Sequence, residues 1–341
     1  MKSSVQRTHG GPDALGSVKH DFSTNSNACG PCPFSALALS EADATRYPDP
    51  SYRVLRQQLA DFHSVEYSRI VLAANASEFI FRFSAWVALS STHGESSMAR
   101  VFIPQLAYGD YGYAAQAWGL EVVNDCNSAN LVWACDPSSP LGQSLCEAPQ
   151  WLTRSESQVN SPGQHVVLDC AYAPLRLEGE SAFNEKQRSM VWQLFTPNKA
   201  LGLTGIRAAY AVAPIHAEEA AKALEERCAS WPIGAHGVAM LQSWVSLETQ
   251  SWVAESRLIL AAWKIRQINM LESLGWKCLP SISNFFCAQP PIAFEVETLR
   301  GCGIKLRDTR SLGLPRYFRL GVLPPASQDV LKFALSNGVY K

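Results

Sequence analysis

The sequence predicts an α/β fold in which a mostly parallel central sheet is flanked by helices, followed by a smaller α+β unit. Six apolar runs have the pattern of buried strands: residues 69–73, 100–104, 131–135, 165–169, 190–195 and 208–213. Segments with helical spacing of apolar residues separate several of these runs, and such alternation is typical of a parallel sheet. Residues 276–341 contain short strand-like runs with two helices, which indicates the smaller unit.

The chain is expected to divide into three parts. Residues 1–45 are rich in Gly, Ser, Asn and Pro with little periodicity, and we expect them to form an N-terminal arm that contributes to the small domain and the active site. Residues 46–235 are expected to form the large α/β domain, and residues 236–341 the small C-terminal α+β domain. Helices are predicted at residues 52–62, 75–89, 215–229 and 236–274.

Charge and hydropathy exclude several classes of partner. The net charge of the 341 residues is −1 and the pI is about 6.7, so no overall field draws the chain to nucleic acid or to an anionic membrane. No apolar run approaches the ~20 residues that span a bilayer. The first nine residues lack the apolar core of a signal peptide. We therefore expect a soluble, cytoplasmic protein with neither a nucleic-acid nor a membrane partner.

The ten cysteines are scattered, and several lie inside strand-like runs, where free thiols behave as small apolar groups. Cys29-Gly-Pro-Cys32 has the form of a dithiol redox motif. It follows a loop-like segment rather than a first strand, and Pro33 comes immediately after it, which disfavours redox catalysis. No second pair of cysteines or histidines has the spacing of zinc ligands, so no metal site is predicted.

Small or polar residues follow most of the strand-like runs. They occupy residues 74–77, 136–142, 169–172 and 196–207, together with Tyr108. Because parallel sheets bind ligands at the carboxyl ends of their strands, we expect these segments to converge at one edge. A cap and small residues at the start of the helix after residue 74 leave backbone N–H groups free to hold an anion.

The segment between the last two strand-like runs carries Lys199, Gly202, Gly205 and Arg207 and no other charge. Burial disfavours a charged lysine, and a neutral amine can attack a carbonyl to form a Schiff base. The arginine offers a planar fork that suits phosphate. Taken alone, the segment more often represents a surface lysine, a glycine turn and a solvated arginine. Together with the other residues at the same sheet edge, it indicates a site.

With Lys199, Arg207, Asp169 and Tyr172 considered together, the chain resembles the fold-type-I pyridoxal-phosphate (PLP) enzymes over nearly its full length. The resemblance implies that Lys199 forms the Schiff base with the cofactor and that Arg207, eight residues later, binds its phosphate. Asp169 would pair with the pyridine nitrogen and keep it protonated, which makes the ring an electron sink. Tyr172 would hydrogen-bond the ring hydroxyl. Residues 46–235 would then be the PLP-binding domain.

The same resemblance implies further cofactor contacts. Thr196, Ala76 and Ser77 would hold the phosphate, and Tyr108 would stack on the ring. Tyr47 would reach the phosphate bound by the neighbouring subunit, which implies a homodimer with shared active sites.

Within that family, the N-terminal arm is similar to that of the L-threonine-O-3-phosphate decarboxylases, a cobalamin-pathway branch related to the histidinol-phosphate aminotransferases. The matching pattern is His9-Gly-Gly11 followed by Asp-Phe-Ser-x-Asn-x-Asn-x-x-Gly-Pro at residues 21–31. The resemblance implies that His9 and Asn25 help to hold a substrate phosphate and that Arg307 joins them. Arg319, in the run Tyr-Phe-Arg-Leu-Gly, would take the α-carboxylate. Without a site nearby, the basic cluster of residues 307–319 would equally suit a solvated face.

Two positions and one spacing depart from the family pattern. Ser139 stands where the family has the asparagine that hydrogen-bonds the ring hydroxyl, so its shorter side chain is expected to reach that group only through water. Ala28 stands where a proline usually follows the arm's second asparagine. The spacing from Arg307 to Arg319 is shorter than in the family.

The expected activity is PLP-dependent decarboxylation of L-threonine O-3-phosphate to (R)-1-aminopropan-2-ol O-phosphate in cobalamin biosynthesis. A histidinol-phosphate-type aminotransferase is the second interpretation, because it uses the same cofactor residues and differs in which bond at Cα is broken. A PLP-binding partner protein with impaired catalysis is the third, and Ser139 is the residue that points to it.

Overall fold

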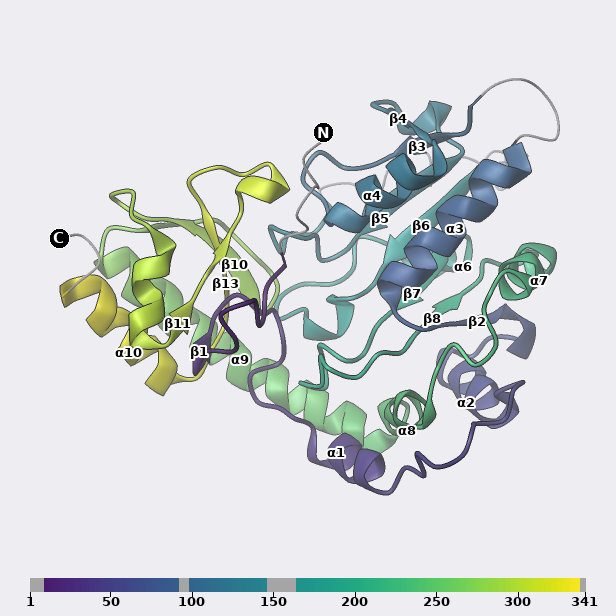
Figure 1. Ribbon diagram of the computed structural model, residues 1–341, viewed down its shortest axis with the longest axis horizontal. Coiled ribbons are helices and arrows are strands. Elements are labelled where there is room, and N and C mark those ends of the chain that lie inside the picture. The colour runs from purple at the N-terminus through teal and green to yellow at the C-terminus, as the bar shows by residue number, and fades with distance from the viewer. Residues whose placement is uncertain (1–8, 92–97, 146–163, 338–341) are drawn as a thin grey trace.

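The computed structural model describes residues 9–91, 98–145 and 164–337 (Figure 1). A seven-stranded sheet with helices on both faces forms the larger lobe, and a smaller lobe with its own antiparallel sheet lies beside it. The predicted α/β class with a mostly parallel central sheet is confirmed. No helix of these residues is long and apolar enough to cross a membrane.

The strand order of the large sheet is β2-β8-β7-β6-β5-β3-β4. All neighbouring pairs are parallel except the two that involve β8. The strands are β2 (Ile70–Ala73), β3 (Arg100–Phe102), β4 (Glu121–Val123), β5 (Leu131–Cys135), β6 (His165–Asp169), β7 (Trp192–Phe195) and β8 (Ala209–Val212). β5 and β6 are buried along nearly their whole length because helices cover both faces of the sheet, and such strands are continuously apolar.

Each face of the sheet packs on its own group of helices. One core joins alternate strand residues such as Val71 and Ala209 to α3 (Ala76–Ser91), α4 (Gly109–Trp118) and α7 (Glu218–Glu226). The other joins Ile70 and Tyr210 to α2 (Arg53–His63), α8 (Ala235–Trp244) and α9 (Leu247–Ser273). The alternation follows from the two-residue period of a strand, which sends successive side chains to opposite faces.

The smaller lobe contains a four-stranded antiparallel sheet in the order β12-β13-β10-β9. Its strands are β9 (Lys277–Cys278), β10 (Phe285–Gln289), β12 (Arg307–Asp308) and β13 (Phe318–Gly321), and α10 (Pro325–Asn337) packs with α9 beside it. In the arm, β1 (His20–Asp21) pairs in parallel with β11 (Ile304–Lys305), and α1 (Pro33–Ser40) contacts α8. The arm, purple in Figure 1, thus passes between the two lobes. The boundaries at residues 45 and 235 stay predictions.

Several local predictions were wrong in detail. The helical pattern of residues 236–274 is two helices, because the chain breaks at Val245 and Ser246, whose hydroxyl accepts the Thr249 N–H at 3.3 Å and starts α9. Of the predicted helix at residues 215–229, only α7 (Glu218–Glu226) is helical. The short helix α6 (Glu185–Ser189) was not predicted. The edge strand β4 also escaped prediction, since two of its three residues are exposed and carry no buried-strand pattern.

Candidate active site

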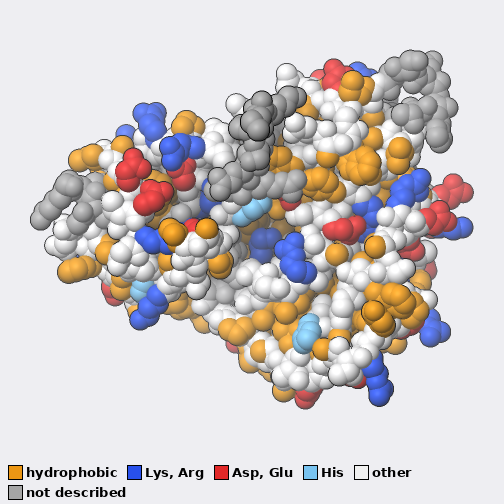
Figure 2. All heavy atoms as spheres, viewed as in Figure 1, with side chains coloured by type: hydrophobic (Ala, Val, Ile, Leu, Met, Phe, Trp, Pro, Cys, Tyr) orange, Lys and Arg blue, Asp and Glu red, His pale blue; other side chains and the backbone are white. Residues whose placement is uncertain are grey.

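A cavity of about 300 Å³ opens where the carboxyl ends of β5, β6 and β7 face the arm and the small sheet. Figure 2 shows the hollow in the middle of this face, with basic side chains and a histidine gathered in it. Thirteen of the fourteen residues expected to form a site line the cavity: His9, Asn25, Ala76, Ser77, Tyr108, Ser139, Asp169, Tyr172, Thr196, Lys199, Arg207, Arg307 and Arg319. Tyr47 does not.

Lys199 lies on the loop that follows β7, half-buried, with Nζ 5.3 Å from the centre of the Tyr172 ring. Asn198 braces this loop, because its Nδ2 donates to the carbonyls of Thr204 at 3.4 Å and Ile206 at 3.2 Å. Its Oδ1 accepts the Thr196 hydroxyl at 2.9 Å. The side chain of Asn198 thereby ties together both ends of the loop that carries the lysine.

The arm holds the same loop from the outside. The Asn27 N–H donates to the Lys199 carbonyl at 2.9 Å, and Asn27 Nδ2 donates to Ala200 O at 2.9 Å. Gly30 packs directly on Gly202, whose φ of +69° favours glycine, and a Cβ added to Gly202 would come within 2.9 Å of the Gly30 Cα. The lysine backbone is therefore fixed by contacts about 170 residues away in the sequence.

Asp169 is the last residue of β6 and is 4% exposed. Its Oδ2 accepts the Tyr111 hydroxyl at 2.6 Å, and its Oδ1 accepts the Ala171 N–H at 2.9 Å. Burial raises the pKa of the Asp169 carboxyl, while these two hydrogen bonds and the charge of Lys199 oppose that rise. The carboxylate is thus held by one donor from Tyr111, which does not line the cavity, and one from Ala171, which does, and it borders the cavity itself.

Tyr172 lies at the same edge, in the turn that follows the last residue of β6, and is buried. Asn25 Nδ2 donates to its hydroxyl at 3.3 Å. The Asn25 side chain is 3% exposed, and its Oδ1 has no hydrogen-bond partner among the described residues. A buried, unpartnered amide oxygen is costly, so this atom marks a place where a ligand donor would be accepted.

At the other end of the cavity, Ser77 Oγ lies 3.2 Å from the Tyr108 hydroxyl, which in turn donates to Asp110 Oδ2 at 2.9 Å. Burial, followed by the charge of Asp110, raises the pKa of Tyr108. Ala76 begins α3, where the first backbone N–H groups of a helix lack carbonyl partners within it, and exposed Arg207 lines this end from the lysine loop. A helix start, hydroxyls and a guanidinium form a set of donors that suits an anion.

Two buried arginines line the side of the cavity formed by the small sheet. Arg307 and Arg319 are direct partners across β12 and β13. The Arg319 Nη2 donates to the Ser23 carbonyl at 3.2 Å, and Arg307 Nη2 donates to Ser311 Oγ at 2.9 Å. Burial and the neighbouring Arg319 charge lower the pKa of Arg307. Like charges placed opposite each other are destabilising, so an anionic ligand between them would relieve a strain that the fold maintains.

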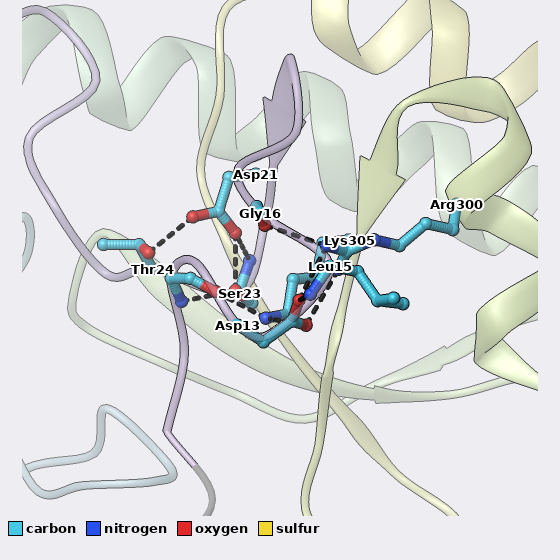
Figure 3. Close-up of polar contacts among 9 residues, drawn as sticks. Asp13, Leu15, Gly16, Asp21, Ser23, Thr24, Arg300 and Lys305 are labelled. Atoms are coloured by element: carbon cyan, nitrogen blue, oxygen red, sulfur yellow. Dashed lines mark hydrogen bonds and ion pairs between the residues drawn. The ribbon is translucent and has the colours of Figure 1, made fainter.

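An ion-pair cluster, here called the arm clasp, ties the N-terminal arm to the small lobe (Figure 3). Asp13 accepts from Lys305 Nζ at 2.7 Å and from both terminal nitrogens of Arg300 at 2.7 and 2.8 Å. These contacts lower the pKa of Asp13 to about 2, the Lys305 hydrogen bond most of all. The arm clasp is Asp13, Arg300 and Lys305.

A second polar group links the arm clasp to the cavity. The Gly11 N–H donates to Ser23 Oγ at 2.8 Å, and that hydroxyl donates to Asp21 Oδ1 at 2.5 Å (Figure 3). Thr24 Oγ1 donates to the other oxygen of Asp21 at 2.6 Å. Since the Ser23 carbonyl accepts from Arg319, the arm and the buried arginine share one network.

Ser139 is 7% exposed and borders the cavity on the loop after β5. Asp136 anchors that loop: it is 2% exposed, and its Oδ2 accepts from Arg176 Nη2 at 2.6 Å. Ser144 Oγ donates to its other oxygen at 3.1 Å. The loop is thus anchored by a buried carboxylate whose charge a buried guanidinium neutralises.

Tyr47 lies away from the cavity, 79% exposed, with its ring stacked 4.6 Å from that of Trp231. Its expected contact with a neighbouring subunit stays a prediction.

Sequence reasoning missed the roles of three residues that hold the site together: Tyr111, Asn27 and Asn198. Tyr111 carried a weak signal, because it starts the i, i+3, i+4 pattern of buried positions in α4 that Ala114 and Ala115 complete. Its contact with Asp169 depends on the strand order, which a single sequence does not reveal.

With this geometry in view, the relatives of the chain can be compared. The family model "Aminotransferase class I and II" matches residues 18–335. The chain belongs to the class I and II aminotransferase family. The histidinol-phosphate aminotransferase of Acinetobacter baylyi is 26% identical over 328 residues, covering 88% of this chain and 86% of that protein. That of Symbiobacterium thermophilum is also 26% identical, with coverages of 92% and 90%.

Solved structures share the fold. Histidinol-phosphate aminotransferase from Sinorhizobium meliloti, in complex with pyridoxal-5'-phosphate, has a TM-score of 0.74 at 21% identity, covering 92% of this chain and 88% of that chain. L-threonine-O-3-phosphate decarboxylase from Porphyromonas gingivalis has a TM-score of 0.74 at 20% identity, with coverages of 92% and 97%. Both branches that the sequence resembles therefore have this fold, and fold similarity does not choose between them.

Pyridoxal 5'-phosphate is the cofactor of this aminotransferase-family chain. The described residues fit such a group. The cavity has a carboxylate at one end, a set of anion donors at the other, and a half-buried lysine between them. Its volume, about 300 Å³, lies at the lower end of the range for small-molecule sites.

Proposed function

We propose that the protein decarboxylates L-threonine O-3-phosphate to (R)-1-aminopropan-2-ol O-phosphate and CO₂ with pyridoxal 5'-phosphate as cofactor. The observation that carries this proposal is the pair of buried arginines, Arg307 and Arg319, in the same cavity as Lys199. A substrate with a carboxylate and a phosphate ester offers one anion to each guanidinium. Histidinol phosphate has a single anionic group, so it would engage only one of the two guanidiniums.

In this proposal the cofactor contacts divide between two ends of the cavity. Ser77, Thr196 and Arg207 hold the phosphate, together with the backbone at Ala76. Asp169 faces the ring nitrogen and Tyr172 the ring hydroxyl. The aromatic side chain of Tyr108 covers the ring, and Ser139 lies on the opposite loop.

When bound, the cofactor supplies an electron sink for the charge that develops at Cα. Asp169 supports this by holding a proton at the ring nitrogen. Lys199 would attach the cofactor and, once the substrate amine has taken its place, its freed amine would lie nearest to Cα and would deliver a proton there after CO₂ leaves. Tyr172 Oη and Asn25 Nδ2, which are 3.3 Å apart, would hold the ring-hydroxyl side of the cofactor.

The substrate is oriented by the small-sheet side of the cavity. Arg319 takes the α-carboxylate, while Arg307, His9 and Asn25 take the substrate phosphate. Two charged anchors on one rigid sheet restrict rotation about Cα, and that rotation decides which bond lies perpendicular to the ring and breaks. The spacing of the two anchors is thus the property that would favour loss of the carboxylate over loss of the α-proton.

The test is a product assay with the holoenzyme and L-threonine O-3-phosphate in the absence of any keto acid. The proposal predicts CO₂ and aminopropanol phosphate in equal amounts. Amino transfer to 2-oxoglutarate from histidinol phosphate, with no CO₂ from threonine phosphate, would replace the proposal with the aminotransferase. That second candidate is favoured by the curated relatives, which are histidinol-phosphate aminotransferases by name.

A catalytically impaired partner protein is the third candidate, and Ser139 is the residue that favours it. The Ser139→Asn variant, which places the family's asparagine at this position, distinguishes an efficient enzyme from a catalytically impaired protein. If the chain is already an efficient enzyme, this variant changes turnover only a few-fold. A large gain over a barely active parent would support the impaired protein.

We also propose a homodimer in which Tyr47 completes the phosphate end of the partner's cavity. Exposed apolar side chains on α1 and α2, which flank Tyr47 in the sequence, support a buried interface; they are Phe34, Leu37 and Val54. Mixing the Tyr47→Ala and Lys199→Ala variants tests shared sites: hybrid dimers regain turnover that neither variant has alone. Sedimentation as a monomer at working concentration would refute the dimer. The place in cobalamin biosynthesis belongs to the same proposal and rests on the sequence resemblance, and the proposed cytoplasmic location rests on the charge and hydropathy of the sequence.

A further inference from the structure

Tyr111 lies behind the cavity and lines no part of it. It belongs to the first turn of α4, its side chain is fully buried, and its hydroxyl donates to Oδ2 of Asp169 at 2.6 Å. Asp169 is therefore the point through which Tyr111 can influence a ligand.

The Tyr111 ring is held rigidly. It stacks on the indole of Trp133 with centroids 4.7 Å apart and planes 7° apart, and the ring of Tyr108 meets it edge-on at 5.8 Å. Trp133 is 1% exposed and lies on β5, the strand next to the one that ends in Asp169. Close packing on several sides leaves one side-chain orientation, so the position of the hydroxyl is set by the core of the large sheet.

The direction of the hydrogen bond is also set. A carboxylate only accepts, so the phenol must be the donor. Burial and the adjacent Asp169 charge raise the pKa of Tyr111 well above its ordinary value, which keeps the phenol protonated. With the Ala171 N–H on the other oxygen, each carboxylate oxygen has one fixed donor and still has lone-pair capacity for a ligand on the cavity side.

We propose that Tyr111 is a positioning residue that orients the Asp169 carboxylate and weakens its basicity, so that a proton shared with the cofactor's ring nitrogen stays on the nitrogen. A proton between two bases lies nearer the stronger one. Donation from Tyr111 withdraws charge from Asp169 and makes it the weaker base of the pair. This inference rests on the proposed cofactor contact of Asp169 and does not depend on the identity of the substrate.

The test uses holoenzyme loaded with cofactor that is ¹⁵N-labelled at the ring nitrogen, without substrate. Tyr111→Phe keeps the ring that stacks on Trp133 and removes only the hydroxyl. The proposal predicts that the ¹⁵N resonance moves toward that of an unprotonated ring and that the dissociation constant of the cofactor rises roughly tenfold. Because neither readout uses substrate, both remain valid if threonine phosphate is not decarboxylated.

Tyr52→Phe is the matched control. Tyr52 is also a buried tyrosine whose hydroxyl makes two hydrogen bonds, to the carbonyl of Ile233 at 2.7 Å and from its N–H at 3.2 Å, but it lies outside the cavity. Loss of this hydroxyl should lower the melting temperature without moving the ¹⁵N resonance. A purely structural role for Tyr111 would give the same pattern in both variants and would overturn the proposal.

A second variant, which changes only the hydrogen-bond donor strength of the phenol, tests the inference if Tyr111→Phe does not fold. Site-specific 2,3-difluorotyrosine at position 111 preserves the hydrogen bond and makes the phenol a stronger donor. The ¹⁵N resonance should then move in the opposite direction, toward a fully protonated ring. An unchanged resonance, with the cofactor bound as in the parent, would contradict the proposal.

Discussion

The two sides of the cavity are built differently. On the sheet side, Asp169 is the last residue of a strand of the seven-stranded sheet, Lys199 lies on the loop after the next strand, and Ser77 lies at the start of the helix that follows a third. On the arm side, His9 and Asn25 come from the first 25 residues, whereas Arg307 and Arg319 come from the last 35. The sheet side is held by strand pairing and aromatic packing, the arm side by polar contacts between distant segments.

This difference indicates which residues of the site can be replaced without destabilising the fold. Asp169 and Tyr111 are embedded in apolar cores, so a change there affects both stability and cofactor binding. The arm clasp is partly exposed, with side-chain exposures of 40% for Asp13, 20% for Arg300 and 14% for Lys305. Partly exposed ion pairs contribute little to stability, so changes in the arm clasp should act on substrate binding alone.

The largest expected effect comes from the sheet side. Lys199→Ala removes the group that attaches the cofactor and delivers the proton, so turnover should fall by at least about 10³-fold. The visible absorption of the bound cofactor should change as well. Lys222→Ala, an exposed lysine on α7, is the control and should behave as the parent. Retained turnover in Lys199→Ala would show that the residues on the sheet side do not carry out the chemistry.

Arg319→Lys tests the arm side with the charge preserved. Lysine cannot present two parallel N–H groups to a carboxylate, so KM for the substrate should rise roughly 10- to 100-fold. The absorption of the bound cofactor should stay the same. Arg310→Lys, which changes an exposed arginine paired with Asp308, is the matched control. A changed cofactor spectrum in Arg319→Lys would show that the two sides are not separable.

Asp13→Asn opens the arm clasp without changing the size of the side chain. We expect KM to rise roughly two- to tenfold with kcat nearly unchanged, because Asp13 touches only the arm and the small lobe. High salt should bring the KM values of the parent and the variant closer together, since it screens these ion pairs in the parent. An unchanged ratio of the two KM values at high salt would indicate that the arm is held by other contacts.

The arm clasp also has a defined pH window. The pKa of Asp13 is about 2 in the folded protein, against 3.8 as its ordinary value. Its contribution to arm docking is therefore fully present above pH 3.8 and is lost as the pH falls through about 2. KM should show no titration of the arm clasp between about pH 5 and 8.

The smallest effect is expected from His63, which lies behind β7 with Nε2 2.9 Å from the Tyr210 hydroxyl. Burial lowers its pKa to about 4, so the folded state keeps it neutral while the unfolded state binds a proton below 6.5. His63 alone should decrease the free energy of unfolding by on the order of 1 to 3 kcal/mol between pH 6.5 and 4. Chemical denaturation at several pH values measures this loss. His63→Asn should reduce it, and His236→Asn, at an exposed position, should not.

The two sides also differ in how far the sequence predicts them. Apolar runs at residues 131–135 and 165–169 predict buried parallel strands, and strand ends meet at one edge by geometry, so the convergence of Asp169 and Lys199 follows. That Arg307 and Arg319 lie opposite each other depends on the register of two short strands. Short polar strands carry little pattern, so the resemblance to a family, and not periodicity, pointed to those arginines.

The contacts that support the site residues cannot be predicted from the sequence, for a further reason. Tyr111 reaches Asp169 across a helix–sheet interface, and Asn27 reaches the lysine loop from about 170 residues away. Local secondary-structure propensity does not predict such contacts, because they depend on the order of the strands and on which distant segments pack together. A cluster such as the arm clasp is equally invisible, since Asp13 and Lys305 are ordinary charged residues in the sequence.

The central claim is that Lys199 at the sheet edge is the residue to which the cofactor is attached. Borohydride reduction of the holoenzyme, followed by digestion and mass spectrometry, tests it directly, because reduction makes the attachment permanent. The pyridoxyl mass should appear on the peptide that contains Lys199 and on no other lysine. The same mass on a different lysine, or no labelled peptide from protein that had bound the cofactor, would contradict the account.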